Sequence, residues 1–524
     1  MSHAVLAAAA TGFKAPDVNY AQLSPILIVF GVAVVAVLVE AFVSRRWRYV
    51  TQLVLSLGGV IAALVAVVLL AGTHTTTASG AVAIDGPGLF LEGTILALAL
   101  VSLLLIAERQ VDAAGDAFAP RASAVPGSRD EQLAIRAGVS QTEVFPLTLF
   151  AIGGMLVFPT ANDLLTMFIG LEVLSLPLYL LSGLARRRRL ISQEAALKYF
   201  LLGAFSSAFF LFGIAMLYGY SGSVSLTGIA QAVSNTTTND VLGLLGIALV
   251  SVGLLFKAAA VPFQAWTPDV YQGAPTPITG FMAACTKVAA FGALLRVYFV
   301  ALGGMAWDWR PMIAGIAILT MLVGAVVALT QTDIKRMLAY SSIAHAGFVL
   351  TAVLAVNAAG RRGVLFYLLA YGFMTLGAFA IVTLVRDSGG EATHLSQWAG
   401  LGKRAPVVAT VFSLFLLAMA GIPLTSGFMS KYAVFSAALG AGAQGLGVAV
   451  VIVGVLASAI AAFFYVRVIV LMFFSEPAVD GPTVAVPSAL TTVAVTVGAA
   501  VTLVLGIVPQ PVLDLAARAG DFIH

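Results

Sequence analysis

Residues 254–287 read LLFKAAAVPFQAWTPDVYQGAPTPITGFMAACTK. The stretch starts as a hydrophobic helix that carries Lys257 shortly before Pro262, opens into a loop, and enters a second apolar run that carries Lys287. A lysine at the centre of a bilayer costs roughly 2.5–3.5 kcal/mol, so such residues usually face protein or water and serve a function. A proline break at membrane depth is tolerated where the backbone is buried or lines a wet cavity. The stretch therefore indicates part of an ion path. The alternative is a pair of lysines whose stems reach back to the membrane surface.

The composition is that of a membrane protein with many spans. Of the 524 residues, 60% are hydrophobic and 10% charged, a balance that soluble globular chains do not have. The net charge of +4 gives no indication of nucleic-acid binding, because membrane topology alone places basic residues in short loops. The single cysteine, Cys285, excludes an internal disulfide and a cysteine-ligated iron–sulfur cluster. Only His345 among the five histidines lies in a hydrophobic segment, so we expect no bis-histidine haem and no cofactor in this chain.

Hydropathy predicts an all-α polytopic membrane protein with about fourteen transmembrane helices. The Ala-rich stretch Ala7–Ala10 has no basic region before it and is too short for a signal peptide. The apolar runs of bilayer length fall near Ser24–Val43, Thr51–Ala71, Leu89–Ala107, Val144–Phe158, Asp163–Leu184, Glu194–Tyr220, Val241–Val261, Pro277–Ala301, Pro311–Thr330, Met337–Val356, Val364–Val385, Ala405–Leu439, Leu446–Phe474 and Ala485–Val508.

An even number of spans places both chain ends on one side of the membrane. If that side is outside, the inner loops hold most of the loop lysines and arginines, as the positive-inside rule requires. We therefore expect both termini on the outer side. The run Arg186–Arg189 is either such a topology signal or a site for a lipid or a partner. We expect Glu108–Gln141 to be a long, polar, mobile inner loop and Ser221–Asp240 to be a polar outer loop.

Charged residues recur at apparent membrane depth in successive predicted helices. Packing can explain one such residue, but a series through the bundle indicates function. We expect Arg296 and Arg467 to form structural pairs rather than to carry protons. The full series is Glu40, Glu172, Lys198, Lys257, Lys287, Arg296, Lys431 and Arg467.

A second run, LAMAGIPLTSGFMSKYAVF, repeats the layout of the opening stretch, because Pro423 and Gly427 interrupt it just before Lys431. Two broken helices in corresponding positions indicate inverted repeats with a site near the midplane. Residues 162–173 and 332–343 are a weaker pair of counterparts. The predicted division is a three-helix segment with an inner loop at 1–140, five-helix repeats at 141–302 and 303–475, and a C-terminal helix and tail at 476–524.

A carboxylate and a lysine inside a membrane can act together as a proton switch. Burial destabilises the ammonium and an adjacent carboxylate stabilises it, so separation of the partners favours proton release and their approach favours uptake. Glu172, deep in GLEVLSLPLYLL, and Lys257 are the candidate pair. The alternative for Glu172 is a structural carboxylate that a neighbouring helix satisfies.

Lys287 and Lys431 extend this pair into a chain of proton-transfer groups across the bundle. Lys287 lies in the middle of its apolar run, and Lys431 lies beside a helix break that water can reach. We expect waters and three hydroxyl groups to lie between the lysines, those of Ser251, Thr286 and Ser430.

Four further residues have two interpretations each. Lys198 either joins the relay or reaches to the inner surface. His345 either relays protons, since an imidazole titrates near neutral pH, or packs as a hydrogen-bonded side chain. Lys335 is either an inner-loop charge or the border of a proton entry, and Tyr340 is either a hydroxyl relay or an interface aromatic.

Four motifs together resemble a known family, namely PDVYQGAPTPIT, GLEVLSLPLYLL, DIKRMLAYSSIAHAGF and AGIPLTSGFMSKYAVF. Over about residues 140–475 the chain resembles the antiporter-like subunits of respiratory complex I, and most closely subunit N of the bacterial NADH:quinone oxidoreductase. The sister subunits L and M and the Mrp cation/proton antiporter subunits are less similar, with HAEAP-like sequences where this chain has VYQGAP. Unlike subunit L, this chain is expected to have no long lateral helix after Val508.

The resemblance implies two inverted repeats, each with a broken helix, and a proton-translocating role in a quinone-reducing complex. It implies that FMN, the iron–sulfur clusters and quinone belong to other subunits. It implies a bacterial plasma (inner) membrane location, with lipids, a sister subunit M and the small subunits K, J and A as partners. The residues that fall on family positions are Glu172 and Lys257 for the Glu–Lys pair, Lys287 for the central lysine, Lys431 for the lysine toward the outlet, and Lys198, Lys335 and Tyr340.

The chain departs from the family at one position. Many relatives have a histidine seven residues after the first broken-helix lysine, where this chain has Gln264. Because glutamine does not titrate, water or another side chain has to replace it if that step is used here.

Two other functions remain open on the sequence alone. The first is a cation/proton antiporter subunit or a free-standing secondary transporter, against which the GAPTP stretch counts. The second is a structural subunit whose charges only hold neighbours together, in which case lysine substitutions would damage assembly rather than turnover.

Overall fold

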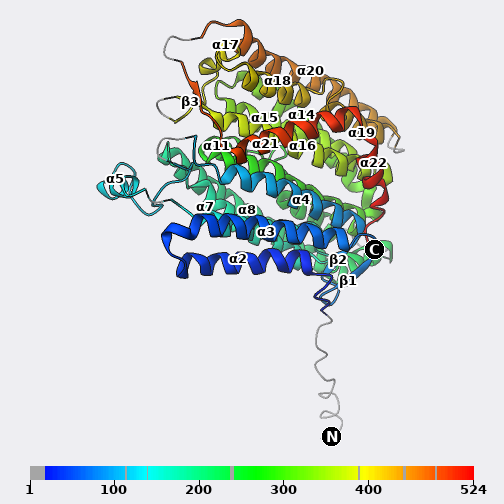
Figure 1. Ribbon diagram of the computed structural model, residues 1–524. Helices are drawn as coiled ribbons and strands as arrows, with labels where there is room; N and C mark the ends of the chain where they lie inside the picture. Colours follow the sequence, from blue (N-terminus) through cyan, green and yellow to red (C-terminus); the bar gives the residue numbers. More distant parts are fainter. Residues whose placement is uncertain are drawn as a thin grey trace, which may run out of the picture.

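The structure is a computed structural model that describes residues 18–111, 115–138, 140–235, 241–387, 390–440, 444–477 and 481–523. The stretch Ala7–Ala10 lies outside these residues. Helices form almost all of the described chain and run side by side, while the short strands lie at the ends of the bundle (Figure 1).

The first part of the chain contains three long helices and a short hairpin. In order, these are α2 (Ser24–Phe42), α3 (Arg45–Leu69), β1 (Thr75–Thr77), β2 (Val82–Ile84) and α4 (Gly86–Ile106). The hairpin is antiparallel, with Thr76 opposite Ala83. Asp85 begins α4, because its side chain accepts a hydrogen bond from the backbone N–H of Gly88 at 2.9 Å and so satisfies a donor at the helix start.

The loop after α4 is better anchored than the sequence indicates. Its described residues include the short helix α5 (Arg129–Arg136). Arg186 pairs with Asp116 at 2.5 Å, and Arg189 pairs with Glu131 at 2.7 Å. The expectation of a mobile loop therefore does not hold for these parts. Arg186, Arg188 and Arg189 thus bind other parts of this chain, beyond any role of the run as a topology signal.

The next part contains five long helical segments, one of which is broken. These are α6 (Val144–Thr160), α7 (Leu164–Ser182), α8 (Arg189–Ser221), the broken pair α10 (Val241–Ala258) and α11 (Trp266–Gly273), and a composite helix of α12 (Thr276–Phe281), η2 (Met282–Thr286), α13 (Lys287–Arg296) and η3 (Val297–Ala301). The helix α9 (Leu226–Asn235) occupies much of the predicted polar loop between α8 and α10.

The third part has the same plan, followed by the C-terminal helices. Its elements are η4 (Gly303–Met305), α14 (Ala306–Thr330), α15 (Ile334–Val353), α16 (Ala358–Leu384), β3 (Val385–Asp387), β4 (Gly390–Glu391), η5 (Leu395–Trp398), α17 (Leu401–Arg404), the broken pair α18 (Pro406–Ala420) and α19 (Ser426–Leu439), α20 (Gln444–Phe474), β5 (Thr483–Val484), α21 (Ala489–Ile507) and α22 (Gln510–Arg518). In the small sheet, β3 pairs antiparallel with β4 and with β5. Among the described residues after Val508, the helix α22 has 9 residues.

Within the described residues, 11 helices are long and apolar enough to cross a membrane by length and composition, and α6 and α18 are shorter apolar helices. The chain is therefore a multi-pass membrane protein. The predicted total of about fourteen spans stays a prediction. The long apolar run 405–439 is divided between α18 and α19, because the chain turns at Gly421 and Leu424, which both have positive φ.

Two helices form the centre of the bundle. The most apolar window of the composite helix 276–301 is 100% buried, and that of α16 is 94% buried, against 33% for α2 and 28% for α20. The candidate site lies around these central helices, while the outer helices present apolar side chains to the surroundings.

Two helix starts make the same backbone contacts at opposite ends of the bundle. Asp163 caps α7, and the N–H of the next residue donates to the carbonyl of Val224 at 3.0 Å. Asp333 caps α15 in the same way, and the N–H of the next residue donates to the carbonyl of Thr393 at 2.7 Å. The Asp163 contacts lie at the end that carries β2 and Ile523, and the Asp333 contacts lie at the end that carries β3 and α17 (Figure 1).

Candidate functional site

The first helix break follows Lys257 directly. Helix α10 ends at Ala258, and Ala259 has a φ of 63°, a left-handed conformation that ends the helical pattern. The N–H of Val261 donates to the hydroxyl of Thr320 on α14 at 3.0 Å. The freed backbone is therefore satisfied inside the protein, which is the condition for a break at membrane depth.

Lys257 is 3% exposed and lies among aromatic rings. Its Nζ donates to the hydroxyl of Tyr199 at 3.3 Å, and it lies 5.0 Å from the Tyr199 ring centre and 5.6 Å from that of Tyr179. Ring faces stabilise a cation at such distances. Glu172 acts on Lys257 electrostatically, but its Oε1 is buried without a hydrogen-bond partner. The structure thus brings the predicted pair together without joining them directly.

Lys287 is also 3% exposed and lies on the central composite helix. It follows the π-helical turn η2, a wide turn of the kind often found at functional sites. Its Nζ donates to the backbone carbonyl of Ser342 on α15 and lies 5.3 Å from the ring centre of Tyr371. No carboxylate pairs with this lysine among the described residues.

His345 lies between Lys287 and Lys431, and both lysines act on it electrostatically. Its Nδ1 bonds the hydroxyl of Tyr367 at 2.6 Å, and its Nε2 is 3.4 Å from the hydroxyl of Tyr465. The imidazole therefore has hydrogen-bonding partners on both ring nitrogens and joins α16 to α20. This arrangement fits either a relay or a packing histidine.

Lys431 lies just after the second helix break and is 6% exposed. Its Nζ donates to the carbonyl of Ala420, the last residue of α18, at 2.8 Å. A side chain at Gly421 would have its Cβ 3.0 Å from Cδ of Lys431, and the φ of Gly421 is +88°, so glycine suits this position in both respects. The amino group of Lys431 thus lies at the C-terminus of α18, where a positive charge is favourable.

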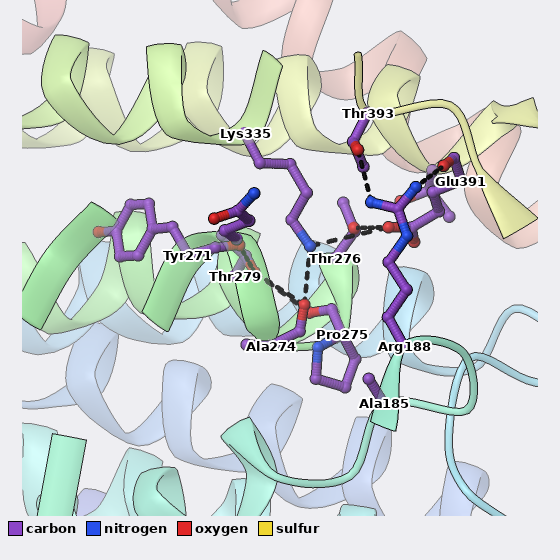
Figure 2. Close-up of polar contacts among 12 residues, drawn as sticks. Ala185, Arg188, Tyr271, Ala274, Pro275, Thr276, Thr279, Lys335, Glu391 and Thr393 are labelled. Atoms are coloured by element: carbon purple, nitrogen blue, oxygen red, sulfur yellow. Dashed lines mark hydrogen bonds and ion pairs between the residues drawn. The ribbon is translucent and has the colours of Figure 1, made fainter. Parts of the chain in front are cut away.

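Lys335 is a buried residue of the first turn of α15 and not an inner-loop charge. Figure 2 shows its side chain reaching toward Ala274 and Glu391. Its Nζ donates to the carbonyl of Ala274 at 2.7 Å and lies 3.7 Å from a carboxylate oxygen of Glu391. The hydroxyl of Thr276 donates to the same carboxylate at 2.5 Å, and Arg188 donates to the hydroxyl of Thr393 at 2.6 Å.

Lys335, Glu391 and Arg188 border a cavity of about 40 Å³ at the end of the bundle that carries β3, together with Ala274 and Thr393. That volume holds a water molecule or a few, and the polar atoms around it give water the partners that it needs. The alternative in which Lys335 borders a proton entry stays a prediction. Its assignment to a loop is wrong, because the Asp333 cap places Lys335 in the first turn of α15.

Two candidate residues lie apart from the buried lysines. Lys198 is 43% exposed in its side chain and pairs with Glu194 and Asp269, each at 2.7 Å. Asp269 also pairs with Arg336 at 2.7 Å. Tyr340 is half-buried and packs against the apolar core.

The predicted hydroxyl bridges between the lysines are not formed as expected. Ser251 bonds the hydroxyl of Tyr298 at 2.5 Å, Ser430 bonds the carbonyl of Ser426 at 2.8 Å, and the buried hydroxyl of Thr286 has no partner. Tyrosines take their place around the lysines and the histidine. Sequence reasoning missed them because a tyrosine in an apolar helix also fits ordinary packing. The residues concerned are Tyr179, Tyr199, Tyr367, Tyr371 and Tyr465.

Gln264 lies in the loop of the first break, between α10 and α11. Its side-chain oxygen is buried without a hydrogen-bond partner, so it does not connect Lys257 to Lys287 in this structure. Arg296 forms the expected structural pair, with Asp85 at 2.8 Å, whereas Arg467 donates to the backbone carbonyls of Leu329 and Gln331 and does not pair with a carboxylate in the described chain. The part of the chain that the structure describes contains no group of three or more His, Cys, Asp and Glu residues that could hold a metal ion.

Comparison with known proteins agrees with this arrangement. Residues 161–461 match the family described as NADH:quinone oxidoreductase/Mrp antiporter, TM. The chain is 65% identical to "NADH-quinone oxidoreductase subunit N" of Rhodococcus opacus, over 100% of this chain and 99% of the relative. It is 58% identical to the protein of the same name in Mycobacterium tuberculosis, over 97% of this chain and 99% of the relative.

Solved structures have the same fold. A chain of respiratory complex I from Thermus thermophilus matches with a TM-score of 0.75 and 33% identity, over 94% of this chain and 99% of that chain. A chain of the Mrp complex from Dietzia matches with a TM-score of 0.79 and 23% identity, over 95% and 96% of the two chains, and this likeness concerns the fold alone. The broken helices, the buried lysines and these matches agree, and the chain belongs to the family of antiporter-like membrane subunits shared by NADH:quinone oxidoreductases and Mrp antiporters.

Proposed function

We propose that this chain is subunit N of the membrane arm of a proton-translocating NADH:quinone oxidoreductase, and that it moves protons while quinone is reduced elsewhere in the complex. The relatives at 57–65% identity carry that name. The observation that carries the proposal is the burial of Lys257, Lys287 and Lys431 on three helical segments of the bundle, two of them beside helix breaks. Buried lysines of this kind mark proton or ion pathways in membrane proteins.

The proposed switch is the approach and separation of Glu172 and Lys257. Lys257 bonds a tyrosine hydroxyl, and the buried oxygen of Glu172 has no partner, so this structure represents a separated arrangement. When the two side chains approach, the carboxylate stabilises the ammonium and favours proton uptake; when they separate, release is favoured. The charge on Lys257 then influences the protonation of Lys287. His345 links Lys287 to Lys431, the lysine toward the proton outlet.

We propose that protons enter at the cavity lined by Lys335 and Glu391, whose polar contacts Figure 2 shows. A line of polar groups leads from that cavity toward Lys287. The hydroxyl of Thr279 bonds the carbonyl of Tyr271 at 3.1 Å, and the Tyr271 hydroxyl lies beside Ser342, whose carbonyl accepts from Lys287. The hydroxyl of Ser342 also lies beside that of Tyr371, so a water molecule can bridge these three hydroxyls.

The predicted topology and domain division remain part of this proposal. With both termini on the outer side, the end that carries β3 and the cavity faces the cytoplasm, which is the side from which protons are taken up. The matching contacts of Asp163 and Asp333 at opposite ends of the bundle support inverted repeats at 141–302 and 303–475. FMN, iron–sulfur clusters and quinone are assigned to other subunits of the complex. Subunits M, K, J and A and lipids of a bacterial plasma membrane are the proposed neighbours.

The test is proton translocation per quinone reduced in membranes that carry Lys257→Ala, with assembly of the complex checked in parallel. The proposal expects lower translocation in an assembled complex. Normal translocation would refute the switch at Lys257. Failed assembly of Lys257→Ala together with Lys257→Gln would instead favour a structural subunit, and sodium-dependent proton exchange by the isolated chain would favour an antiporter.

A further inference from the structure

Glu92 on α4 is a buried carboxyl group outside the series of lysines. It is 1% exposed, and neither carboxyl oxygen has a hydrogen-bond partner in the described chain. Among the described residues, Glu172 has one buried carboxyl oxygen without a partner, whereas Glu92 has two. By contrast, Glu108, just beyond the other end of α4, accepts hydrogen bonds from Ser488 and Thr491. Glu92 therefore stands out as a titratable group that packing alone does not explain.

An ionised carboxylate in such a position is very unfavourable. Burial of an unpaired charge costs several kcal/mol even after relaxation, so the group avoids the cost by holding a proton. A neutral carboxyl group still lacks hydrogen-bond partners at this site, but that penalty is much smaller. The burial of both oxygens thus indicates that Glu92 is protonated in the arrangement that the structure describes.

The charged groups that act on Glu92 are Asp85 and Arg296. These two side chains are 0% exposed and form a two-pronged ion pair, with both N–O distances 2.8 Å. The pair is also fixed to its surroundings. Arg296 donates to the carbonyl of Pro159 at 2.6 Å, and Asp85 accepts from the backbone N–H of Ile523 at 3.1 Å. Of the two charges, Asp85 acts on Glu92 more strongly and opposes negative charge there, while Arg296 offsets only part of that effect, so the ion pair helps Glu92 to hold its proton until water reaches it.

The depth of Glu92 along the bundle can be derived from the packing of the preceding residue, Leu91. A Cβ on Gly292 would lie 2.7 Å from a methyl carbon of Leu91, so this turn of α4 packs against α13 at Gly292. On α13, Gly292 lies between Lys287 and Arg296. Along the bundle, Glu92 therefore lies at a depth between Lys287 and the Asp85–Arg296 ion pair. This is the half of the bundle in which the C-terminal end of the chain lies.

We propose that Glu92 is a proton-release site in this half of the bundle. Glu92 accepts a proton from the direction of Lys287 and delivers it toward the end of the bundle that carries Asp85 and Arg296. The proposal rests on the proposed function above. In the release step the proton leaves a carboxyl oxygen for water that enters when the contact between Leu91 and Gly292 loosens. The carboxylate that remains is unfavourable, because it is buried and Asp85 repels it more strongly than Arg296 attracts it, so Glu92 takes up a second proton readily.

The first measurement is the infrared spectrum of the purified complex. Wild type is expected to show the C=O stretching band of a buried protonated carboxyl group, shifted in D₂O, and Glu92→Gln is expected to lose it. This readout does not depend on pumping. Persistence of the same band in Glu92→Gln, or its absence from wild type, would overturn the protonated state of Glu92.

The second measurement is proton translocation per quinone reduced in the assembled complex. Glutamine keeps the size and the neutral charge of a protonated glutamate but cannot release a proton, so a purely structural role predicts normal translocation in Glu92→Gln. The proposal expects loss of this chain's share of the protons, with at least partial recovery in Glu92→Asp. Normal translocation in Glu92→Gln overturns it.

A matched control is Thr94→Val, which removes a buried hydroxyl two residues along α4 that bonds only the carbonyl of Phe90. It is expected to change neither readout. The two proposals fail in different ways. If Lys257→Ala pumps normally while Glu92→Gln does not, the switch is wrong and the release site stands; the opposite pattern removes the release site and leaves the switch.

Discussion

Glu172 and Lys257 lie within electrostatic range of each other, yet Lys257 donates its hydrogen bond to Tyr199 at 3.3 Å and not to the carboxylate. The distance between the two residues is therefore free to change without the loss of an existing ion pair. A switch needs two arrangements of similar free energy. Lys257 can form them, because it can bond either the hydroxyl of Tyr199 or the carboxylate of Glu172.

The first prediction is that Glu172→Gln lowers proton translocation per quinone reduced while the complex still assembles. Glutamine keeps the shape of the side chain but removes the charge that stabilises the ammonium of Lys257 when the two approach. Translocation in inside-out membrane vesicles is the measurement. Thr148→Val on the neighbouring helix α6 is the control, since its buried hydroxyl donates to the carbonyl of Val144 and lies outside the predicted relay. Equal translocation in Glu172→Gln and in the control would contradict the switch.

The second prediction separates the two roles of Lys431. Lys431→Ala leaves the carbonyl of Ala420 without its donor, and loss of a hydrogen bond to a charged group costs about 1.5–3 kcal/mol, so the complex should be less stable to heat. Lys431→Gln can still donate to that carbonyl but cannot carry a proton. It is expected to restore much of the thermal stability and none of the translocation. Recovery of translocation in the glutamine variant would show that Lys431 acts only as a helix cap.

Much of this arrangement could be predicted from the sequence, because the strongest signals are local. Charged residues in apolar runs and prolines beside Lys257 and Lys431 mark functional helices without any knowledge of the packing. The helix start at Asp163 likewise agrees with the predicted run and with the preference for aspartate at N-caps, whereas α15 begins at Ile334, three residues before the run predicted from Met337.

The remaining features depend on contacts between distant segments, which no local pattern contains. A tyrosine such as Tyr199 or Tyr367 has the same appearance in sequence whether its hydroxyl meets a lysine, a histidine or lipid headgroups. The ion pair between Asp85 and Arg296 joins residues 211 positions apart. Lys335 was mistaken for a loop residue because a basic pair after a polar stretch is typical of a loop.

The third prediction concerns that ion pair. Arg296→Leu leaves Asp85 as a buried charge without its cationic partner, and removal of one member of a buried pair costs about 3–5 kcal/mol. Asp85→Asn should be harmful for the same reason. The double variant Asp85→Asn with Arg296→Leu leaves no charge behind and is expected to be more stable than Arg296→Leu alone. Thermal denaturation of the purified complex measures all three, and strict additivity of the two single effects would contradict the prediction.

The fourth prediction is a pH dependence at the start of α21. Burial alone would raise the pKa of Glu108, but hydrogen bonds from Ser488 and Thr491 outweigh that effect and hold its pKa below the usual value. A carboxyl group with a lowered pKa stabilises the folded state above its ordinary pKa of about 4.3, and this contribution is lost as the pH falls from there through the folded-state pKa. Above that window the contribution is complete and independent of pH.

Hydrogen exchange at the first turn of α21, corrected for the intrinsic rate, is therefore expected to be constant near neutral pH and to rise in wild type below about pH 4.3. Glu108→Gln has no carboxylate to protonate, so its protection should be lower near neutral pH and should not change across that window. Ser488→Ala removes one donor and the N-cap of α21 together, and should expose the same turn at every pH. A wild-type profile with the same slope as that of Glu108→Gln would show that the first turn of α21 is held by its apolar contacts alone.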